Sequence, residues 1–250
     1  MQRTRSIMGM MITVDIVDSA VAEENFVKVF NYFKYIDEKF STYKKDSEIT
    51  QINNKSLKAG SYSTDMKTVL SLCEKTKQET NGYFDIEQDG KIDPSGLVKG
   101  WAIKNAAEIL KNENFKNFYI DAGGDIQTFG KNSQGKDWTV GIRNPFNKQE
   151  IIKVLAVSGE GVATSGTYER GKHIYNPVSR KAADQIASVT VIGSGVYEAD
   201  RFATAAFAMG TNGIAFIERQ QGLEGYMIDK KGRATLTSGF ENYTHKHETS

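Results

Sequence analysis

The sequence predicts an α+β fold in which helices pack on a largely antiparallel or mixed β-sheet. Amphipathic helical patterns gather in the first half of the chain, and short strand-like segments gather in the second. The regular alternation of strand and helix that typifies parallel α/β folds is absent. With 250 residues, 39% hydrophobic and 25% charged, the chain can bury a full core. We therefore expect a single domain over residues 1–250.

The amino-terminal half begins with a predicted strand and continues with helices. Apolar residues alternate at Ile12, Val14 and Ile16, the period-2 pattern of a half-buried strand. Apolar residues then recur at helical spacing in three segments, with a helical turn between the first two. The predicted elements are a strand over 7–14, helices over 22–40, 65–80 and 97–111, and the turn over 47–53. Gly82 follows the second helix, as a carboxy-terminal glycine cap does.

The carboxy-terminal half is predicted to be richer in strands. Strands are expected over 118–121, 126–129, 138–142, 151–157, 161–165 and 187–191, followed by helices over 197–209 and 213–221. A strand pair over 226–228 and 234–237 turns through Asp229-Lys-Lys-Gly232. From about Glu241 the tail is polar, and we expect it to fray.

Composition excludes several classes of protein. Lys and Arg number 32 against 31 Asp and Glu, so broad electrostatic capture of nucleic acid is not expected. The single cysteine, Cys73, allows no internal disulfide and no cysteine-based metal cluster. No apolar run approaches the roughly 18 residues of a membrane span. The apolar stretch 7–14 is followed at once by Asp15 and Asp18 rather than by a cleavage site, so we expect a cytoplasmic protein.

One pair of residues indicates a metal site. Asp200 and Thr204 lie four positions apart in a predicted helix, which places both on one face. A carboxylate and a hydroxyl are oxygen ligands of the kind that Mg²⁺ takes. The same pair is also common on solvated helix faces, so the spacing alone does not decide.

Three further segments combine polar and small residues. One is Asp93-Pro-Ser-Gly-Leu-Val-Lys-Gly-Trp-Ala102, and another ends a predicted strand with Gly123-Gly-Asp125. The third, 163–177, contains His173, the one histidine outside the polar tail. Paired glycines allow a bend or the close approach of a ligand, and a histidine can act as a general base near neutral pH.

In this order, the four segments resemble the ApbE family, the FAD:protein FMN transferases. The resemblance runs from Met8 to about Phe240 and includes Phe40-Ser-Thr-Tyr43, Gly82-Tyr-Phe-Asp85, Thr164-Ser-Gly166 and His173-Ile-Tyr-Asn-Pro177. It implies an ApbE-like, T-fold-like architecture. Family members split FAD with Mg²⁺ and attach its FMN half through a phosphoester bond to a Ser or Thr of a target flavoprotein. AMP is released.

The resemblance also implies roles for individual residues. Asp200, Thr204 and the backbone carbonyl of Val98 would bind Mg²⁺, and His173 would be the base, although a purely structural histidine remains an alternative. Residues expected to contact FAD are Met8, Ser41, Thr42, Asp85, Lys99, Gly123, Gly124, His173 and Ile174. Several of these residues also have a purely structural alternative. Lys99 could be a surface lysine, the two glycines could form a plain turn, and Asp85 could be a cap.

The chain departs from the family pattern at several positions. Only seven residues, Ile86 to Ile92, separate two motifs between which many members carry a long insert. Lys104 and Asn176 stand where many members have Asp. Arg201 and Phe202 replace smaller residues beside the metal motif, and we expect them to narrow the pocket or to alter the binding of a second metal.

Two rival functions stay open at this level. An FAD pyrophosphatase would use the same metal and phosphate contacts but would release FMN and AMP to water. A non-catalytic flavin-binding protein would keep the pocket alone. The joint presence of Asp200, Thr204 and His173 favours an enzyme over the second rival.

Overall fold

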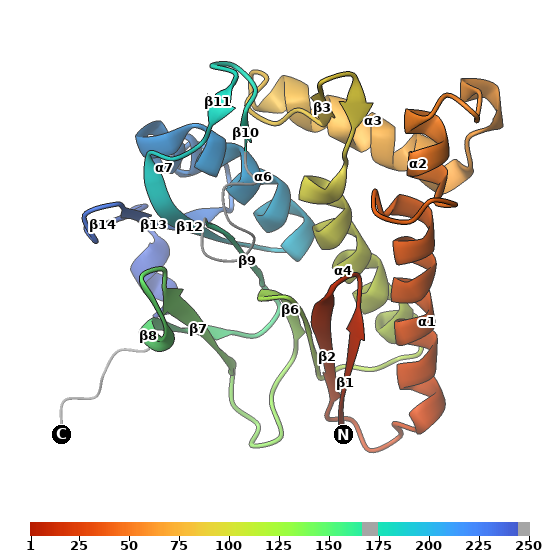
Figure 1. Cartoon of the computed structure of the whole chain (residues 1–250). Helices are drawn as coiled ribbons and strands as arrows, with labels where there is room; N and C mark the ends of the chain where they lie inside the picture. The colour runs from red at the N-terminus through yellow and green to blue at the C-terminus, as the bar shows by residue number, and fades with distance from the viewer. Residues whose placement is uncertain (167–174, 245–250) are drawn as a thin grey trace.

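The computed structural model describes residues 1–166 and 175–244, and it is organised around an eight-stranded antiparallel sheet (Figure 1). The strand order is β1-β2-β5-β6-β9-β12-β13-β14. These strands are β1 Gln2–Ile7, β2 Met10–Ile16, β5 Phe118–Ala122, β6 Asp125–Phe129, β9 Gly161–Gly166, β12 Ile186–Gly193, β13 Glu224–Asp229 and β14 Ala234–Leu236. The predicted α+β class is confirmed, with the sheet antiparallel throughout.

Three separate hairpins accompany the sheet in the described residues, and helices connect its strands. The hairpins are β3 Glu87–Gln88 with β4 Lys91–Ile92, β7 Trp138–Asn144 with β8 Asn147–Val157, and β10 Tyr175–Asn176 with β11 Lys181–Ala182. The helices are α1 Glu23–Phe40, α2 Glu48–Asn53, α3 Thr64–Glu79, α4 Ser95–Asn112, α6 Val196–Ala208 and α7 Gly213–Glu218, with short 3-10 turns η1 Ala59–Ser61, η2 Gly210–Asn212 and η3 Phe240–Tyr243. In the described part of the chain, no helix is both long and apolar enough to cross a membrane.

Local sequence explains where these helices begin. Ser47 and Ser63 cap α2 and α3 by accepting hydrogen bonds from the backbone N–H groups of Thr50 and Met66, each at 3.2 Å. Before α4, the Asp93 carboxylate accepts a hydrogen bond from Ser95 N at 3.0 Å. This hydrogen bond fixes the backbone of residues 93–95, where the chain enters α4.

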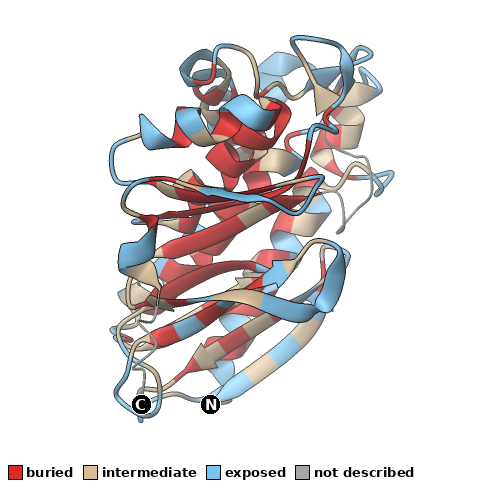
Figure 2. Cartoon of the chain, turned by 90° about the vertical axis from the view of Figure 1, so that its left-hand side faces the viewer, coloured by how far each residue is buried: buried red, intermediate tan, exposed pale blue. Residues whose placement is uncertain are grey.

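Helices cover one face of the sheet, and the β7–β8 hairpin covers part of the other. Strand β13 shows both sides, because successive side chains point to opposite faces. Met227 packs in the cluster formed with α6 and α7, whereas Tyr226 and Ile228 pack against the hairpin around Trp138. Figure 2 shows the buried residues concentrated in the sheet and in the helix faces that meet it. A third cluster joins α1 and α4 to β2 and β5.

Helices α4 and α6 lie side by side across the middle of the sheet (Figure 1). Helix α4 precedes β5, and α6 follows β12, so the two helices belong to different halves of the chain. The line along which they meet therefore brings together residues about 100 positions apart in sequence.

Two sequence-based expectations need correction. The single strand predicted over 7–14 is a hairpin, because Met8 and Gly9 form a turn with φ of 58° and 71° between β1 and β2. The segment from Phe240 to Thr244 is held in place rather than frayed, since Phe240 is buried and Glu241 forms an ion pair with Lys153 at 3.0 Å; the rest of the tail lies outside the described residues. The other predicted helices and strands are confirmed to within a few residues.

Candidate active site

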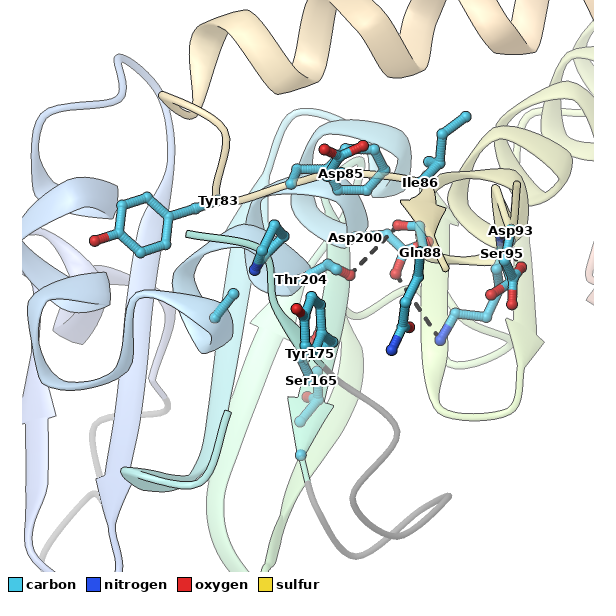
Figure 3. A pocket seen from close by; sticks show the side chains of 17 residues that line it. Tyr83, Asp85, Ile86, Gln88, Asp93, Ser95, Ser165, Tyr175, Asp200 and Thr204 are labelled. Carbon is cyan, nitrogen blue, oxygen red and sulfur yellow. Dashed lines mark hydrogen bonds and ion pairs between the residues drawn. The ribbon is translucent and has the colours of Figure 1, made fainter. Parts of the chain in front are cut away.

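A polar pocket opens where the start of α4, the middle of α6 and the end of β9 meet the segment 83–88. Figure 3 shows Asp200 and Thr204 projecting side by side from α6 into it, with Asp85 on one side and Tyr175 on the other. The pocket is lined by Tyr83, Phe84, Asp85, Ile86, Gln88, Asp93, Ser95, Gly96, Lys99, Thr164, Ser165, Gly166, Tyr175, Pro177, Asp200, Thr204 and Ala208.

Three charged side chains meet beside this pocket: Lys99 and Asp200 line it, and Asp125 lies behind them in contact with Lys99. The Lys99 ammonium nitrogen lies 2.6 Å from Oδ2 of Asp125 and 3.9 Å from Oδ1 of Asp200. Both aspartates are buried, and Lys99 is only partly exposed. The cluster therefore places two buried carboxylates beside one ammonium group. When all three groups are ionised, its net charge is negative.

The backbone of α4 fixes the Asp200 carboxylate. Gly100 N donates a hydrogen bond to Asp200 Oδ2 at 2.7 Å. A Cβ atom on Gly100 would lie 2.7 Å from Asp200 Cβ, closer than real Cβ contacts come. Glycine at position 100 is therefore what lets α4 approach α6 closely enough for this hydrogen bond.

Asp125 is a site residue that the sequence analysis did not select. It is the first residue of β6, directly after the Gly123-Gly124 turn, and its Oδ1 accepts a hydrogen bond from Thr164 N on β9 at 3.1 Å. Its place directly after the two glycines of the Gly-Gly-Asp motif is the sequence signal that marks it.

The environment of Asp200 disfavours the ionised carboxylate unless a cation lies beside it. Burial raises the pKa of Asp200 well above its usual value, and the nearby Asp125 raises it further, while Lys99 and the Gly100 N–H oppose the shift. An ionised carboxylate is held here at a cost in free energy that a bound cation would relieve. Perturbed carboxylates in a pocket are typical of functional sites.

The oxygen atoms beside Asp200 fit a hard cation such as Mg²⁺. Thr204 Oγ1 lies 3.3 Å from the Gly96 carbonyl oxygen, to which it donates a hydrogen bond. Carboxylate, hydroxyl and carbonyl oxygens thus lie together at one end of the pocket. Within residues 1–166 and 175–244, no group of three or more His, Cys, Asp or Glu side chains could hold a metal. Mg²⁺ needs no such group, because it keeps waters and substrate phosphate oxygens as ligands.

A second pocket adjoins the first along the start of α4. Both are lined by Asp93, Ser95 and Lys99, and the second brings in Met8, Ser41, Thr42 and Val98. Four predicted site residues from three parts of the chain thus line the second pocket. Asp85, Asp200 and Thr204 line the first, and Lys99 lines both. An elongated ligand that occupied both would pass the Lys99 ammonium group.

Other predicted site residues are placed differently. Gly123 and Gly124, with φ of 63° and 92°, form the β5–β6 turn and line neither pocket, although Gly123 lies against Met10, which lines the second. The Asp85 carboxylate lies 2.7 Å from Lys77 Nζ. His173 and Ile174 fall outside the described residues.

The expected narrowing of the pocket by Arg201 and Phe202 is not found among the described residues, while an effect on the binding of a second metal stays a prediction. Arg201 points from α6 toward α3, where it forms ion pairs with Glu79 and Glu198. Phe202 is buried against Phe216. Neither side chain lines the two pockets, so neither narrows them.

The two remaining departures also have structural roles. The Lys104 ammonium group lies 5.4 Å from the centre of the Tyr197 ring, away from both pockets. Asn176 donates a hydrogen bond to the Ala208 carbonyl at 2.7 Å and accepts one from Ser179 N at 2.9 Å. Asn176 therefore ties the β10–β11 turn to the end of α6.

The fold is that of solved flavin transferases. The ApbE protein from Thermotoga maritima superimposes with a TM-score of 0.89 at 19% identity, covering 98% of this chain and 99% of that one. The flavin transferase ApbE from Vibrio cholerae superimposes with a TM-score of 0.85 at 20% identity, covering 97% and 98%. At these identities the likeness establishes the architecture.

The sequence comparison establishes the family. The ApbE family model matches residues 8–88 and 86–227, so the chain belongs to the ApbE family. A Salmonella typhimurium protein named FAD:protein FMN transferase is 29% identical over 156 residues, which is 58% of this chain and 45% of that protein. A Haemophilus influenzae protein of the same name is 24% identical over 298 residues, covering 92% and 86%. The chain thus spans about half the length of the first of these relatives.

Proposed function

We propose that this chain is a Mg²⁺-dependent FAD:protein FMN transferase. It would cleave FAD, attach FMN through a phosphoester bond to a Ser or Thr of a target flavoprotein, and release AMP. The observation that carries the proposal is the buried pair Asp125 and Asp200 facing Lys99, with the Thr204 hydroxyl and the Gly96 carbonyl beside it. Family membership and the names of the relatives support it.

The residues of the site divide into two groups. Asp200 and Thr204 would hold the metal together with a backbone carbonyl of α4, for which Val98 was predicted and Gly96 is the one that contacts Thr204. Bound there, Mg²⁺ supplies Lewis-acid stabilisation of charge on the transferred phosphate. Lys99 lies where the two pockets meet and would pair with a phosphate of FAD.

The transfer itself is a substitution at phosphorus. The acceptor hydroxyl oxygen forms a bond to the phosphorus of the FMN half, and the bond from that phosphorus to the bridging oxygen breaks. AMP leaves with the electron pair, and the hydroxyl proton passes to a base, for which we propose His173. The protein contributes by holding the hydroxyl in line, since a positioned nucleophile reaches effective molarities of about 10⁵ M or more.

The test offers FAD, Mg²⁺ and a flavoprotein subunit with its Ser or Thr acceptor, next to the same subunit with that residue changed to Ala. Flavin that survives denaturation should appear only on the first subunit, with a mass gain of one FMN. If neither subunit is labelled and FMN accumulates at the same rate with and without acceptor, the protein is an FAD pyrophosphatase. If FAD binds but is never cleaved at any Mg²⁺ concentration, the chain is a flavin-binding protein.

A further inference from the structure

We propose that Asp125 is a positioning residue that holds the Lys99 ammonium group off Asp200 and so keeps the Asp200 carboxylate available to the metal. This inference rests on the proposed function, because it assumes that Asp200 is a metal ligand. Asp125 belongs to the Gly-Gly-Asp motif, but it was assigned no role from the sequence, and it is not one of the proposed metal ligands.

The geometry of the three charges carries the inference. Lys99 Nζ is 2.6 Å from Asp125 and 3.9 Å from Asp200, so the ammonium group is in contact with one carboxylate and displaced from the other. A Lys ammonium is a compact charge on a flexible stem, so its position depends on which carboxylate holds it. If Asp125 were neutral, the nearest buried anion to Lys99 would be Asp200.

The fold anchors Asp125 more firmly than it anchors Lys99. The Asp125 carboxylate is buried, its Oδ1 accepts the Thr164 N–H at 3.1 Å, and the register of β6 against β9 places it there. Lys99 reaches the cluster from α4 and is partly exposed. Asp125 is therefore the fixed partner, and Lys99 is the one that moves when the balance of charge changes.

The consequence is a competition between two cations for Asp200. A Lys99 ammonium group drawn onto Asp200 would neutralise the carboxylate and occupy space beside it. Metal binding would then require the displacement of a buried ion pair, which weakens the apparent affinity for Mg²⁺. With Asp125 in place, Lys99 stays to one side at 3.9 Å from Asp200 Oδ1, and this oxygen remains open to the metal while Oδ2 accepts the Gly100 N–H.

A double-mutant cycle with Asp125→Asn and Lys99→Met tests this, because Asn keeps an oxygen for the Thr164 N–H. The readout is Mg²⁺ affinity without FAD, obtained from the rise of the melting temperature with Mg²⁺. We expect Asp125→Asn to weaken Mg²⁺ binding about 100-fold when Lys99 is present, but about tenfold or less in the Lys99→Met background. The coupling would then be at least tenfold, or about 1.4 kcal/mol.

A matched pair elsewhere on the chain controls for general charge effects. Lys131 and Asp137 also lie 2.6 Å apart but are exposed, and Lys131→Met with Asp137→Asn should leave Mg²⁺ affinity unchanged. If Asp125→Asn fails to fold, Asp125→Ser takes its place in the same cycle. Equal losses in both backgrounds, meaning additive effects, would overturn the positioning role while leaving the metal site intact. A wild-type protein whose stability does not respond to Mg²⁺ would overturn both.

Discussion

Asp200 and Arg201 are neighbours on α6 but belong to two different charge clusters. The clusters carry the same number of charges of each sign and differ in which charges are buried. Each cluster has one cation and two carboxylates. Around Arg201 the cation is dry at 6% exposure, while Glu79 and Glu198 are 35% and 39% exposed. Around Asp200 the carboxylates are dry, with Asp125 at 1% and Asp200 at 5%, while Lys99 is 16% exposed.

The two clusters differ in where their excess negative charge lies, and on this difference we base a structural role for the first and a metal-binding role for the second. At Arg201 the extra negative charge lies near water, which solvates it, so the cluster is complete without a ligand. Arg201 also lies 3.9 Å from the centre of the Phe202 ring, which adds packing. At Asp200 the extra negative charge lies in a pocket away from bulk water, where either a proton or a bound cation must compensate it.

The largest expected effect is on catalysis by Asp200→Asn. The variant should lower Mg²⁺-dependent FMN transfer about 10³-fold or more, because Lewis-acid stabilisation contributes several kcal/mol. The metal-free melting temperature should stay the same or rise, since one of two buried carboxylates that share a single ammonium group is removed. Transfer at the wild-type rate under ordinary Mg²⁺ would show that Asp200 is not a metal ligand.

The two clusters should respond differently when their cations are removed. Lys99→Met should lower the metal-free stability by about 3 kcal/mol, because two buried carboxylates lose their partner, and Mg²⁺ should restore part of the loss. Arg201→Met should cost about 1–2 kcal/mol through lost packing and hydrogen bonds, with no recovery on adding Mg²⁺. Denaturant unfolding of both variants with and without Mg²⁺ measures this. Equal Mg²⁺ responses would remove the distinction between the clusters.

The close approach of α4 to α6 gives a third contrast. Gly100→Ala should cost about 1–3 kcal/mol and weaken Mg²⁺ binding, since its Cβ would lie 2.9 Å from Asp200 Oδ2. Gly96→Ala should be milder, because its Cβ would meet the Thr204 methyl group at 3.2 Å. Thermal melts of the two variants compare them, and a larger loss for Gly96→Ala would contradict the packing described.

The smallest effect is expected for Thr204→Ala. A neutral ligand can be replaced by water, so transfer should fall only about three- to tenfold at saturating FAD. The Mg²⁺ concentration for half-maximal activity should rise while the fold stays intact. A loss as large as that of Asp200→Asn would mean that the Thr204 hydroxyl does more than ligate.

Sequence patterns predicted which residues share one helix face better than they predicted contacts between segments that are distant in sequence. Spacing was enough to place Asp200 and Thr204 on one face of a helix, because that depends only on α6 itself. Asp125 was missed because its role depends on the pairing of β6 with β9, which brings Thr164 from 39 positions away. The direction of Arg201 was missed for the same reason, since its partner Glu79 lies on α3. The turn at Met8 was missed because it interrupts an apolar run with a non-glycine residue at positive φ.

The most direct test of the account is the effect of Mg²⁺ on the melting temperature of the wild type, Asp200→Asn and Arg201→Met. Binding to the folded state at 100 times the dissociation constant adds about 2.7 kcal/mol, or about 5–10 °C for a chain of this length. The account predicts this rise for the wild type and for Arg201→Met, and none for Asp200→Asn. A rise that persists in Asp200→Asn, or that disappears in Arg201→Met, would contradict it.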